Sequence, residues 1–108
     1  MEFTTLGRTG LKVSVATLGC GGGSALGLKY GKSEQHAANL VKKAMDLGVN
    51  FIDTANAYDS EAAVGLAIKD MSRDQIVIST KHHAAKGGSR KSAEEVIAGL
   101  ENSLRKLQ

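Results

Sequence analysis

The stretch Gln75-Ile76-Val77-Ile78-Ser79-Thr80 decides the fold class of this 108-residue chain. Its centre, Ile76 to Ile78, is a run of three consecutive β-branched apolar residues. A strand in a parallel sheet is covered on both faces, so its sequence is continuously apolar instead of alternating. The stretch therefore predicts a buried strand of a parallel sheet.

The segments on both sides of this strand have the periodicity of helices. Residues 60–69 precede it, and the apolar positions on one side of that helix are Val64, Ala67, Ile68 and Met71. After a basic, glycine-containing loop at 81–91, Ser92-Ala93-Glu94-Glu95 forms a capping box. This box predicts the start of a third helix, whose apolar stripe is Ala93, Val96, Ile97, Leu100, Leu104 and Leu107.

The same alternation extends toward the N-terminus. Residues 49–53 predict a short strand, and the helix before it begins after Ser33 and ends at Gly48, a residue suited to a left-handed C-cap. Residues 15–20 predict the first parallel strand, which runs into a glycine-rich loop. Two short strands within 3–14 flank Gly7-Arg8-Thr9-Gly10 and predict a β-hairpin.

The element order is therefore a hairpin followed by three βα units, at about 15–48, 49–72 and 75–108. Strict alternation of strands and helices predicts an α/β fold with parallel strands and right-handed crossovers. Each unit has roughly 30 residues, an ordinary size for this motif. Two architectures fit this order: an open doubly wound sheet, and the first part of a (β/α) barrel.

Composition excludes several classes of protein. The chain has 14 Lys+Arg and 11 Asp+Glu, a net charge of +3, and only four aromatic residues, so a nucleic-acid partner is not expected. No stretch approaches the roughly 20 apolar residues of a membrane span, and the N-terminus lacks the features of a secretory signal. A single cysteine, Cys20, favours a reducing, cytoplasmic setting.

Chemically active side chains follow the predicted strands at the ends where parallel α/β sheets bind ligands. Gly21, Gly22 and Gly23 follow the first parallel strand. Asp53 ends the second, with Tyr58 five residues later, and Lys81 ends the third. We therefore expect a carboxylate, a phenol and an ammonium to meet at one edge of the sheet.

These three groups together suit proton transfer to a carbonyl oxygen. A free phenol has a pKa of about 10, too high for an efficient acid near neutral pH, and a nearby ammonium favours the phenolate. A carboxylate such as that of Asp53 would hold the Lys81 ammonium in place. Tyr58 could then donate the proton while a reduced nicotinamide supplies hydride. The glycines at 21–23 would let a flat ring approach the backbone closely.

Simpler interpretations of the same residues stay open. Asp53 could be a loop acceptor, Tyr58 a packing residue, and Lys81 a solvated side chain. The pair His82-His83 is interpreted as a polar loop, and no metal site is predicted because no further ligands lie at suitable spacing. Cys20 is interpreted as a small buried residue. The basic segment 86–91 could bind an anion near the Ser92 cap, although a solvated loop is the simpler interpretation.

Several segments closely resemble the aldo-keto reductase family. The run Asp-Thr-Ala-x-x-Tyr at 53–58, followed by Ser60-Glu61, is highly specific for it. The resemblance covers essentially the whole chain and also includes residues 6–14, 18–21, 47–55 and 77–81.

This resemblance implies a (β/α)8 barrel whose bottom is closed by the N-terminal hairpin. It also implies NADPH-dependent reduction of small aldehydes or ketones, or the reverse oxidation of alcohols. In the family pattern, Tyr58 would be the general acid/base, Lys81 its partner, and Asp53 the residue that orients Lys81 near the cofactor. Gly21 and Gly22 fall in the turn that contacts nicotinamide or substrate.

The resemblance further implies that residues 1–108 are the N-terminal part of a truncated barrel, since a whole one needs about 250 residues. The family's catalytic histidine and most of its cofactor-binding segments have no counterpart here, so the chain alone is expected to be inactive. The alternative is a non-catalytic nucleotide-sensing or assembly module of the same fold. Such a module would complete its sheet by forming a homo-oligomer or by associating with the missing C-terminal part.

Overall fold

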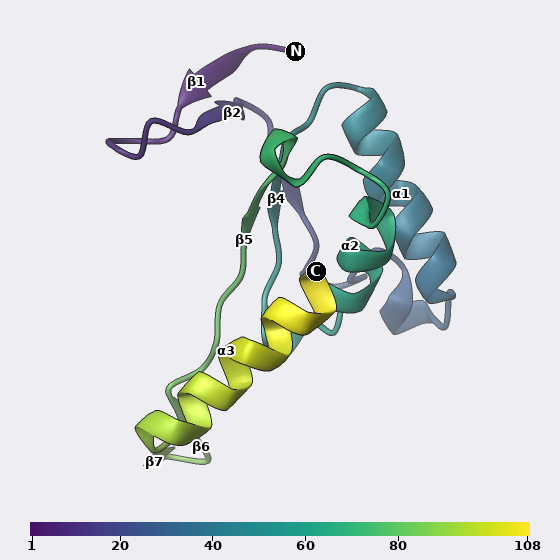
Figure 1. Cartoon of the computed structure of the whole chain (residues 1–108). Helices are drawn as coiled ribbons and strands as arrows, with labels where there is room; N and C mark the ends of the chain where they lie inside the picture. Colours follow the sequence, from purple (N-terminus) through teal and green to yellow (C-terminus); the bar gives the residue numbers. More distant parts are fainter.

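A parallel three-stranded sheet forms the centre of the computed structural model, which describes all 108 residues (Figure 1). Its strands lie in chain order: β3 (Leu18–Gly19), β4 (Phe51–Asp53) and β5 (Val77–Ser79). Ile52 at the centre of β4 pairs with Leu18 on one side and Ile78 on the other. The prediction of an α/β fold with parallel strands is confirmed.

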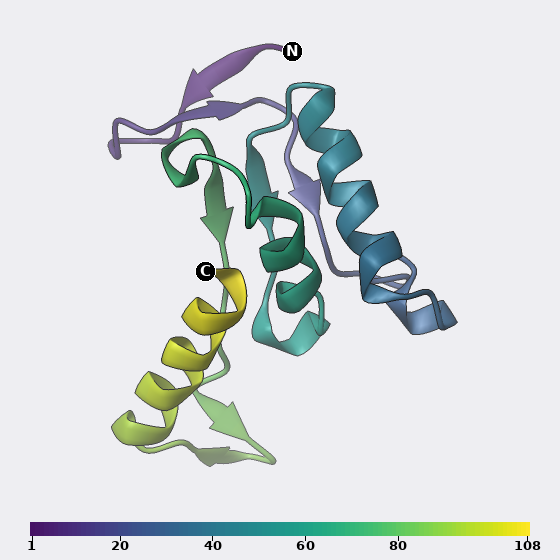
Figure 2. The same ribbon diagram turned by 45° about the vertical axis from the view of Figure 1, so that its right-hand side comes forward.

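Three helices cover one side of this sheet, as Figures 1 and 2 both show. They are α1 (Glu34–Asp46), α2 (Glu61–Ile68) and α3 (Ala93–Leu107). Each lies between or after the strands in the order βαβαβα, and α2 packs against both of the others. Helices on one side are the expected result of right-handed crossovers between strands that follow one another in the sheet.

The N-terminal hairpin lies across the end of the sheet where the parallel strands begin (Figure 2). Strands β1 (Phe3–Thr5) and β2 (Lys12–Ser14) pair in antiparallel register. Asn50, just before β4, joins this hairpin to the sheet: its Oδ1 accepts from the Ser14 N–H at 2.7 Å, and its Nδ2 donates to the Lys12 carbonyl at 3.0 Å. The hairpin predicted over 3–14 is confirmed.

Helix boundaries follow the predicted capping residues. The Ser33 hydroxyl accepts from the His36 N–H at 3.1 Å at the start of α1, and Gly48 has φ +93° just after its end. At the start of α3, the Ser92 N–H donates to Glu95 Oε2 at 2.7 Å and the Glu95 N–H donates to Ser92 Oγ at 3.2 Å. Both predicted N-caps, including the capping box, are confirmed.

The hydrophobic core lies between the sheet and the helices. It is formed by nine buried residues: Cys20, Ala38, Val41, Ile52, Val64, Ala67, Ile68, Ile76 and Leu107. Close helix contact depends on Gly65 of α2, because a Cβ atom there would collide with the Lys106 carbonyl oxygen of α3. The last turn of α3 therefore packs directly on the backbone of α2.

Three features differ from the sequence-based expectations. The loop at 81–91 contains a second hairpin, formed by β6 (Ala85–Lys86) and β7 (Ser89–Arg90). Its two-residue turn, Gly87-Gly88, has positive φ at both positions, which the right-handed twist of a hairpin favours.

The second difference is the length of the parallel strands. The segments predicted as the strands 15–20, 49–53 and 75–80 form regular ladders of only two or three residues. Residues Arg73–Gln75 form a short 3-10 helix, η3, before the last of them.

The third difference concerns the apolar stripe predicted on α3. Of its members, only Leu107 is buried, while Ile97, Leu100 and Leu104 are 56%, 46% and 59% exposed. The C-terminal end of the helix packs against α2, as Figure 1 shows, whereas these three apolar residues lie before that end and are exposed. None of the helices has the length and apolarity needed to cross a membrane.

Candidate active site

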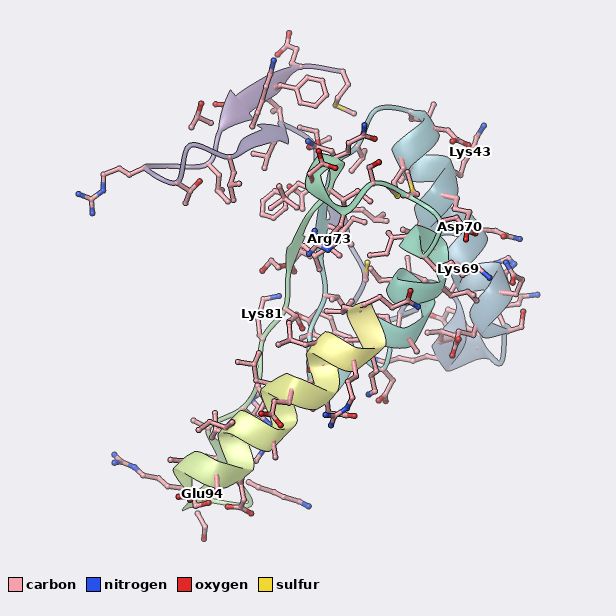
Figure 3. All side chains as sticks on the ribbon, viewed as in Figure 1. Lys43, Lys69, Asp70, Arg73, Lys81 and Glu94 are labelled. Carbon is pink, nitrogen blue, oxygen red and sulfur yellow. The ribbon has the colours of Figure 1, made fainter.

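Asp53 and Lys81 form an ion pair at the end of the sheet opposite the N-terminal hairpin. The Lys81 Nζ donates to Asp53 Oδ1 at 2.7 Å and to the Thr54 carbonyl oxygen at 2.8 Å. The same Nζ lies 5.3 Å from the centre of the Tyr58 ring. The carboxylate, the phenol ring and the ammonium are thus brought together. Figure 3 shows the Lys81 side chain where the chain leaves β5.

Strand register explains how Lys81 reaches Asp53. Asp53 pairs with Ser79 in the parallel ladder, and residues two apart on a strand point to the same face. Lys81 therefore points to the same side as Ser79, one step beyond the pair. The Asn56 N–H donates to the Lys81 carbonyl at 3.0 Å, so the two chain segments stay together after the ladder ends.

Tyr58 is held by its local backbone and by the glycine loop. It ends the 3-10 helix η2 (Asn56–Tyr58), and the next residue, Asp59, has the left-handed φ of +57°. A Cβ atom at Gly21 would lie 2.7 Å from Cε2 of the Tyr58 ring. Gly21 is therefore required for the ring to sit against the turn that follows β3.

Cavities lie on both sides of Tyr58. One, of about 320 Å³, is lined by Gly19, Gly21, Gly22, Asp53 and Tyr58. The other, of about 260 Å³, is lined by Ala55, Ala57, Tyr58, Lys81, His82 and His83. All of the predicted site residues, Gly21, Gly22, Asp53, Tyr58 and Lys81, therefore line one or both of these hollows.

Cys20 lies beneath this site and is completely buried. Burial raises the pKa of its thiol to about 11, with a further contribution from the Asp53 carboxylate that Lys81 partly offsets. Its backbone N–H donates to the Asp53 carbonyl at 2.8 Å. The interpretation of Cys20 as a small buried residue agrees with these contacts.

The histidine pair is more than the polar loop that the sequence suggested. His82 is half-buried beneath α3, where its ring occupies the space that a Cβ atom of Gly99 would need. Its Nε2 lies 3.1 Å from Lys91 Nζ, and both histidines line the second cavity. A glycine in the middle of a predicted helix was the sequence signal for this close approach. The structure contains no cluster of three or more His, Cys, Asp or Glu side chains able to hold a metal ion.

One residue next to the site, Glu61, was not predicted as functional. Glu61, the first residue of α2, is buried and accepts a hydrogen bond from Thr80. The basic segment 86–91, considered for anion binding, belongs mainly to the small β6–β7 hairpin and is almost entirely exposed.

Comparison with known proteins identifies the family. The model of the aldo/keto reductase family matches residues 17–108. The chain belongs to the aldo/keto reductase family. This membership confirms the resemblance inferred from the sequence.

Two curated proteins show how similar the sequence of this chain is to other members of the aldo/keto reductase family. One is a Schizosaccharomyces pombe protein whose name describes a voltage-gated potassium channel subunit β. It is 39% identical over 117 residues, covering 99% of this chain and 33% of the relative. L-galactose dehydrogenase of Arabidopsis thaliana is 37% identical over 114 residues, covering 100% and 35%. The chain spans about a third of the length of the curated relatives it matches.

Solved structures of aldo-keto reductases share the fold. The thermostable aldo-keto reductase Tm1743, in complex with the inhibitor epalrestat, superposes with a TM-score of 0.75 at 28% identity, covering 99% of this chain and 39% of that one. A Bombyx mori aldo-keto reductase in complex with NADP gives 0.71 at 26% identity, covering 93% and 32%. The fold of this chain therefore matches part of an aldo-keto reductase.

Proposed function

We propose that this chain is the N-terminal part of a truncated (β/α)8 barrel of an NADPH-dependent reductase that converts small aldehydes or ketones to alcohols, or catalyses the reverse reaction. The observation that carries the proposal is the 2.7 Å ion pair between Lys81 and Asp53, with the Tyr58 ring 5.3 Å from the same ammonium. Family membership supports the reaction class, and the NADP complex of the Bombyx mori relative supports the cofactor.

In this proposal, Tyr58 donates a proton to the carbonyl oxygen of the substrate. Lys81 lies beside the phenol and stabilises negative charge that develops on its oxygen, because a nearby cation favours the phenolate. Asp53 orients Lys81 through the 2.7 Å hydrogen bond and prevents the ammonium from turning toward solvent. In the reverse direction, the same phenol oxygen accepts the proton of the alcohol.

The hollow beside Gly21 and Gly22 fits the nicotinamide end of the cofactor. Three of its five lining residues are glycines, so a flat ring can approach the backbone, and Asp53 offers a carboxylate that can accept hydrogen bonds. Gly21, Gly22 and Asp53 are thus the proposed cofactor contacts in this chain. When bound, a reduced nicotinamide supplies the hydride.

The decisive experiment uses a chain of the full length of its relatives, with residues 1–108 in place. Oxidation of NADPH is followed by absorbance with a panel of aldehydes and ketones. Tyr58→Phe should lower the rate by roughly a hundredfold or more, since it removes the proton donor and leaves the ring. Tyr30→Phe is the matched control, because Tyr30 is 73% exposed and lies outside the site. Equal rates for the two variants would contradict the proposal.

A second candidate function is a non-catalytic nucleotide-sensing or assembly module. The similarity to the Schizosaccharomyces pombe protein and the exposed apolar face of α3 favour it. Such a module would bind NADPH but oxidise it no faster in wild type than in Tyr58→Phe. Calorimetric binding of the nucleotide without turnover of any carbonyl would therefore select this function over the reductase.

A further inference from the structure

Glu61 is a buried carboxylate that joins three elements next to the candidate active site. It is the first residue of α2, and only 1% of its surface is exposed. Its Oε1 accepts a hydrogen bond from the Thr80 hydroxyl at 2.7 Å. Its Oε2 has no hydrogen-bond partner, and the nearest cation is Lys106 Nζ of α3 at 3.8 Å.

The residue before Glu61 makes a second buried link. Ser60 and Thr54 are both completely buried, and their hydroxyl oxygens lie 3.0 Å apart. Thr54 directly follows Asp53, the last residue of β4, while Thr80 lies between Ser79, the last residue of β5, and Lys81. Two neighbouring residues at the start of α2 are thus hydrogen-bonded to the tips of both strands that carry the ion pair.

These links constrain the positions on which the Lys81 ammonium depends. Both of its acceptors, Asp53 Oδ1 and the Thr54 carbonyl oxygen, belong to the tip of β4, whereas Lys81 itself belongs to the tip of β5. The regular ladder between the strands ends at Asp53 and Ser79, before Lys81. Beyond this point, the Asn56 N–H still donates to the Lys81 carbonyl at 3.0 Å, and the hydrogen bonds of Ser60 and Glu61 link both tips to one helix as well.

Packing alone does not explain a carboxylate at this position. A buried charge must recover its lost hydration through good partners, and an apolar side chain of similar volume usually packs at least as well. Glu61 has one full hydrogen bond, and that bond goes to the residue next to Lys81. The geometry thus points to a role in setting the position of β5's tip.

We propose that Glu61 is a positioning residue that, through Thr80, holds the Lys81 ammonium against Asp53. The proposal rests on the proposed function for its catalytic meaning, since Lys81 acts there beside Tyr58. The positioning itself is a property of this chain and can be measured without any turnover.

The test measures the reactivity of Lys81 by partial acetylation of the folded chain and peptide mass spectrometry. Lys43, exposed on α1 and far from Lys81 in Figure 3, provides the reference within the same sample. A lysine whose amine donates to a carboxylate and a carbonyl should react slowly, because its nitrogen must leave these acceptors before it can attack the acylating reagent. Thr80→Val removes the hydroxyl at nearly constant shape and should raise the Lys81-to-Lys43 ratio several-fold. Thr80→Ser keeps the hydroxyl and should retain the wild-type ratio.

A second variant and a stability control separate positioning from loss of folding. Glu61→Asp keeps the charge but withdraws the carboxylate from Thr80, so it should also raise the Lys81-to-Lys43 ratio. This variant tests the proposal even if Thr80→Val fails to fold. Val41→Ala weakens core packing on α1, a helix that carries neither Thr80 nor Lys81, and should leave the ratio at the wild-type value in the folded protein. An unchanged ratio in a folded Thr80→Val or Glu61→Asp chain would overturn the proposal.

Failure of the proposed function has a different signature. In a chain of the relatives' length, Thr80→Val should lower kcat with little change in KM for the carbonyl, and Thr80→Ser should restore kcat. If Tyr58→Phe were fully active while the acetylation ratios changed as expected, the reductase mechanism would fail and the positioning of Lys81 by Glu61 would stand.

Discussion

Because Gly21 lies against the Tyr58 ring, adding a single carbon atom at position 21 tests whether this turn holds the ring in place. Gly21→Ala places a Cβ atom where Tyr58 Cε2 would be 2.7 Å away, so the ring must move. We expect a loss of about 1–3 kcal/mol of unfolding free energy, as for other overpacked sites, and a large fall in carbonyl reduction. Urea unfolding measures the loss of stability, and NADPH oxidation by a chain of the relatives' full length measures the fall in carbonyl reduction. The NMR shifts of the Tyr58 ring protons report the movement of the ring.

Gly23→Ala is the matched control for this substitution. Residue 23 lies in the same loop, has no atoms within 4 Å of its added Cβ, and does not have a positive φ. It should leave both stability and the Tyr58 resonances close to wild type. If Gly21→Ala behaved like Gly23→Ala, the ring would not be held against this turn.

Burial of Cys20 predicts a loss of stability at alkaline pH. Its pKa is raised from 9.0 to about 11, so above pH 9 the unfolded chain releases the thiol proton while the folded chain keeps it. The folded state then binds more protons, and stability falls as pH rises. The contribution is full below pH 9 and is lost by about pH 11, a decrease of roughly 2–3 kcal/mol.

Lysine and tyrosine side chains titrate in the same range, so the prediction concerns a difference between two proteins. The unfolding free energy of wild type minus that of Cys20→Ala, measured in urea at successive pH values, should decline between pH 9 and pH 11. A difference that stays constant across this range would show that the thiol titrates alike in the folded and unfolded chains.

Some site residues could be predicted from the sequence and others could not. Asp53, Tyr58 and Lys81 follow predicted strands, and parallel strands bring such residues to one edge, so their proximity follows from topology. Glu61 was part of the resembling motif, yet an acidic residue in the first turn of a helix is ordinarily solvated and stabilises the N-terminus. Its burial comes from α3 packing over α2, a tertiary contact that local sequence does not contain.

At the scale of elements, the start of α3 depends on its capping box. Ser92→Ala removes the hydroxyl that accepts from the Glu95 N–H and should cost about 1 kcal/mol of unfolding free energy. Ser72→Ala is the matched control, because Ser72 precedes η3 without making a side-chain capping bond. Equal losses in urea unfolding for the two variants would contradict a stabilising role for the box.

Element order was predictable because periodicity and caps are local properties of the chain. The second hairpin was missed because β6 and β7 have only two residues each, too few to show alternation, although Gly87-Gly88 is a good hairpin turn. The regular ladders are shorter than the predicted strands, since a ladder ends where a neighbour no longer supplies hydrogen bonds, whatever the propensity of the next residue.

For the whole molecule, the apolar face of α3 is the main departure from an ordinary packed domain. Periodicity alone predicts that Ile97, Leu100 and Leu104 face a core, yet all three are exposed. Strand β5, at the edge of the three-stranded sheet, is likewise only half-buried. Exposed apolar helices and open sheet edges are typical sites for association. They bear directly on how the 108-residue chain behaves alone.

We predict that the 108-residue chain by itself does not reduce carbonyl compounds. Asp53, Tyr58 and Lys81 are in place, but the proposed cofactor contacts are confined to Gly21, Gly22 and Asp53, near the nicotinamide end. Too few contacts then remain to hold a whole dinucleotide in a productive orientation, and orientation supplies much of the rate of such a reaction. NADPH absorbance with a panel of aldehydes measures this directly. Turnover that Tyr58→Phe abolishes would contradict the prediction.

Light scattering of the same samples separates inactivity from assembly, because the reductase fragment and the assembly module differ in mass. A chain whose exposed α3 face associates should gain mass with concentration above the 11.3 kDa of the monomer. Leu100→Glu and Leu104→Glu together should then restore the monomer, since like charges on the contact face repel when two copies meet. A monomer at every concentration would argue against the assembly module and leave the inactive reductase fragment as the consistent interpretation.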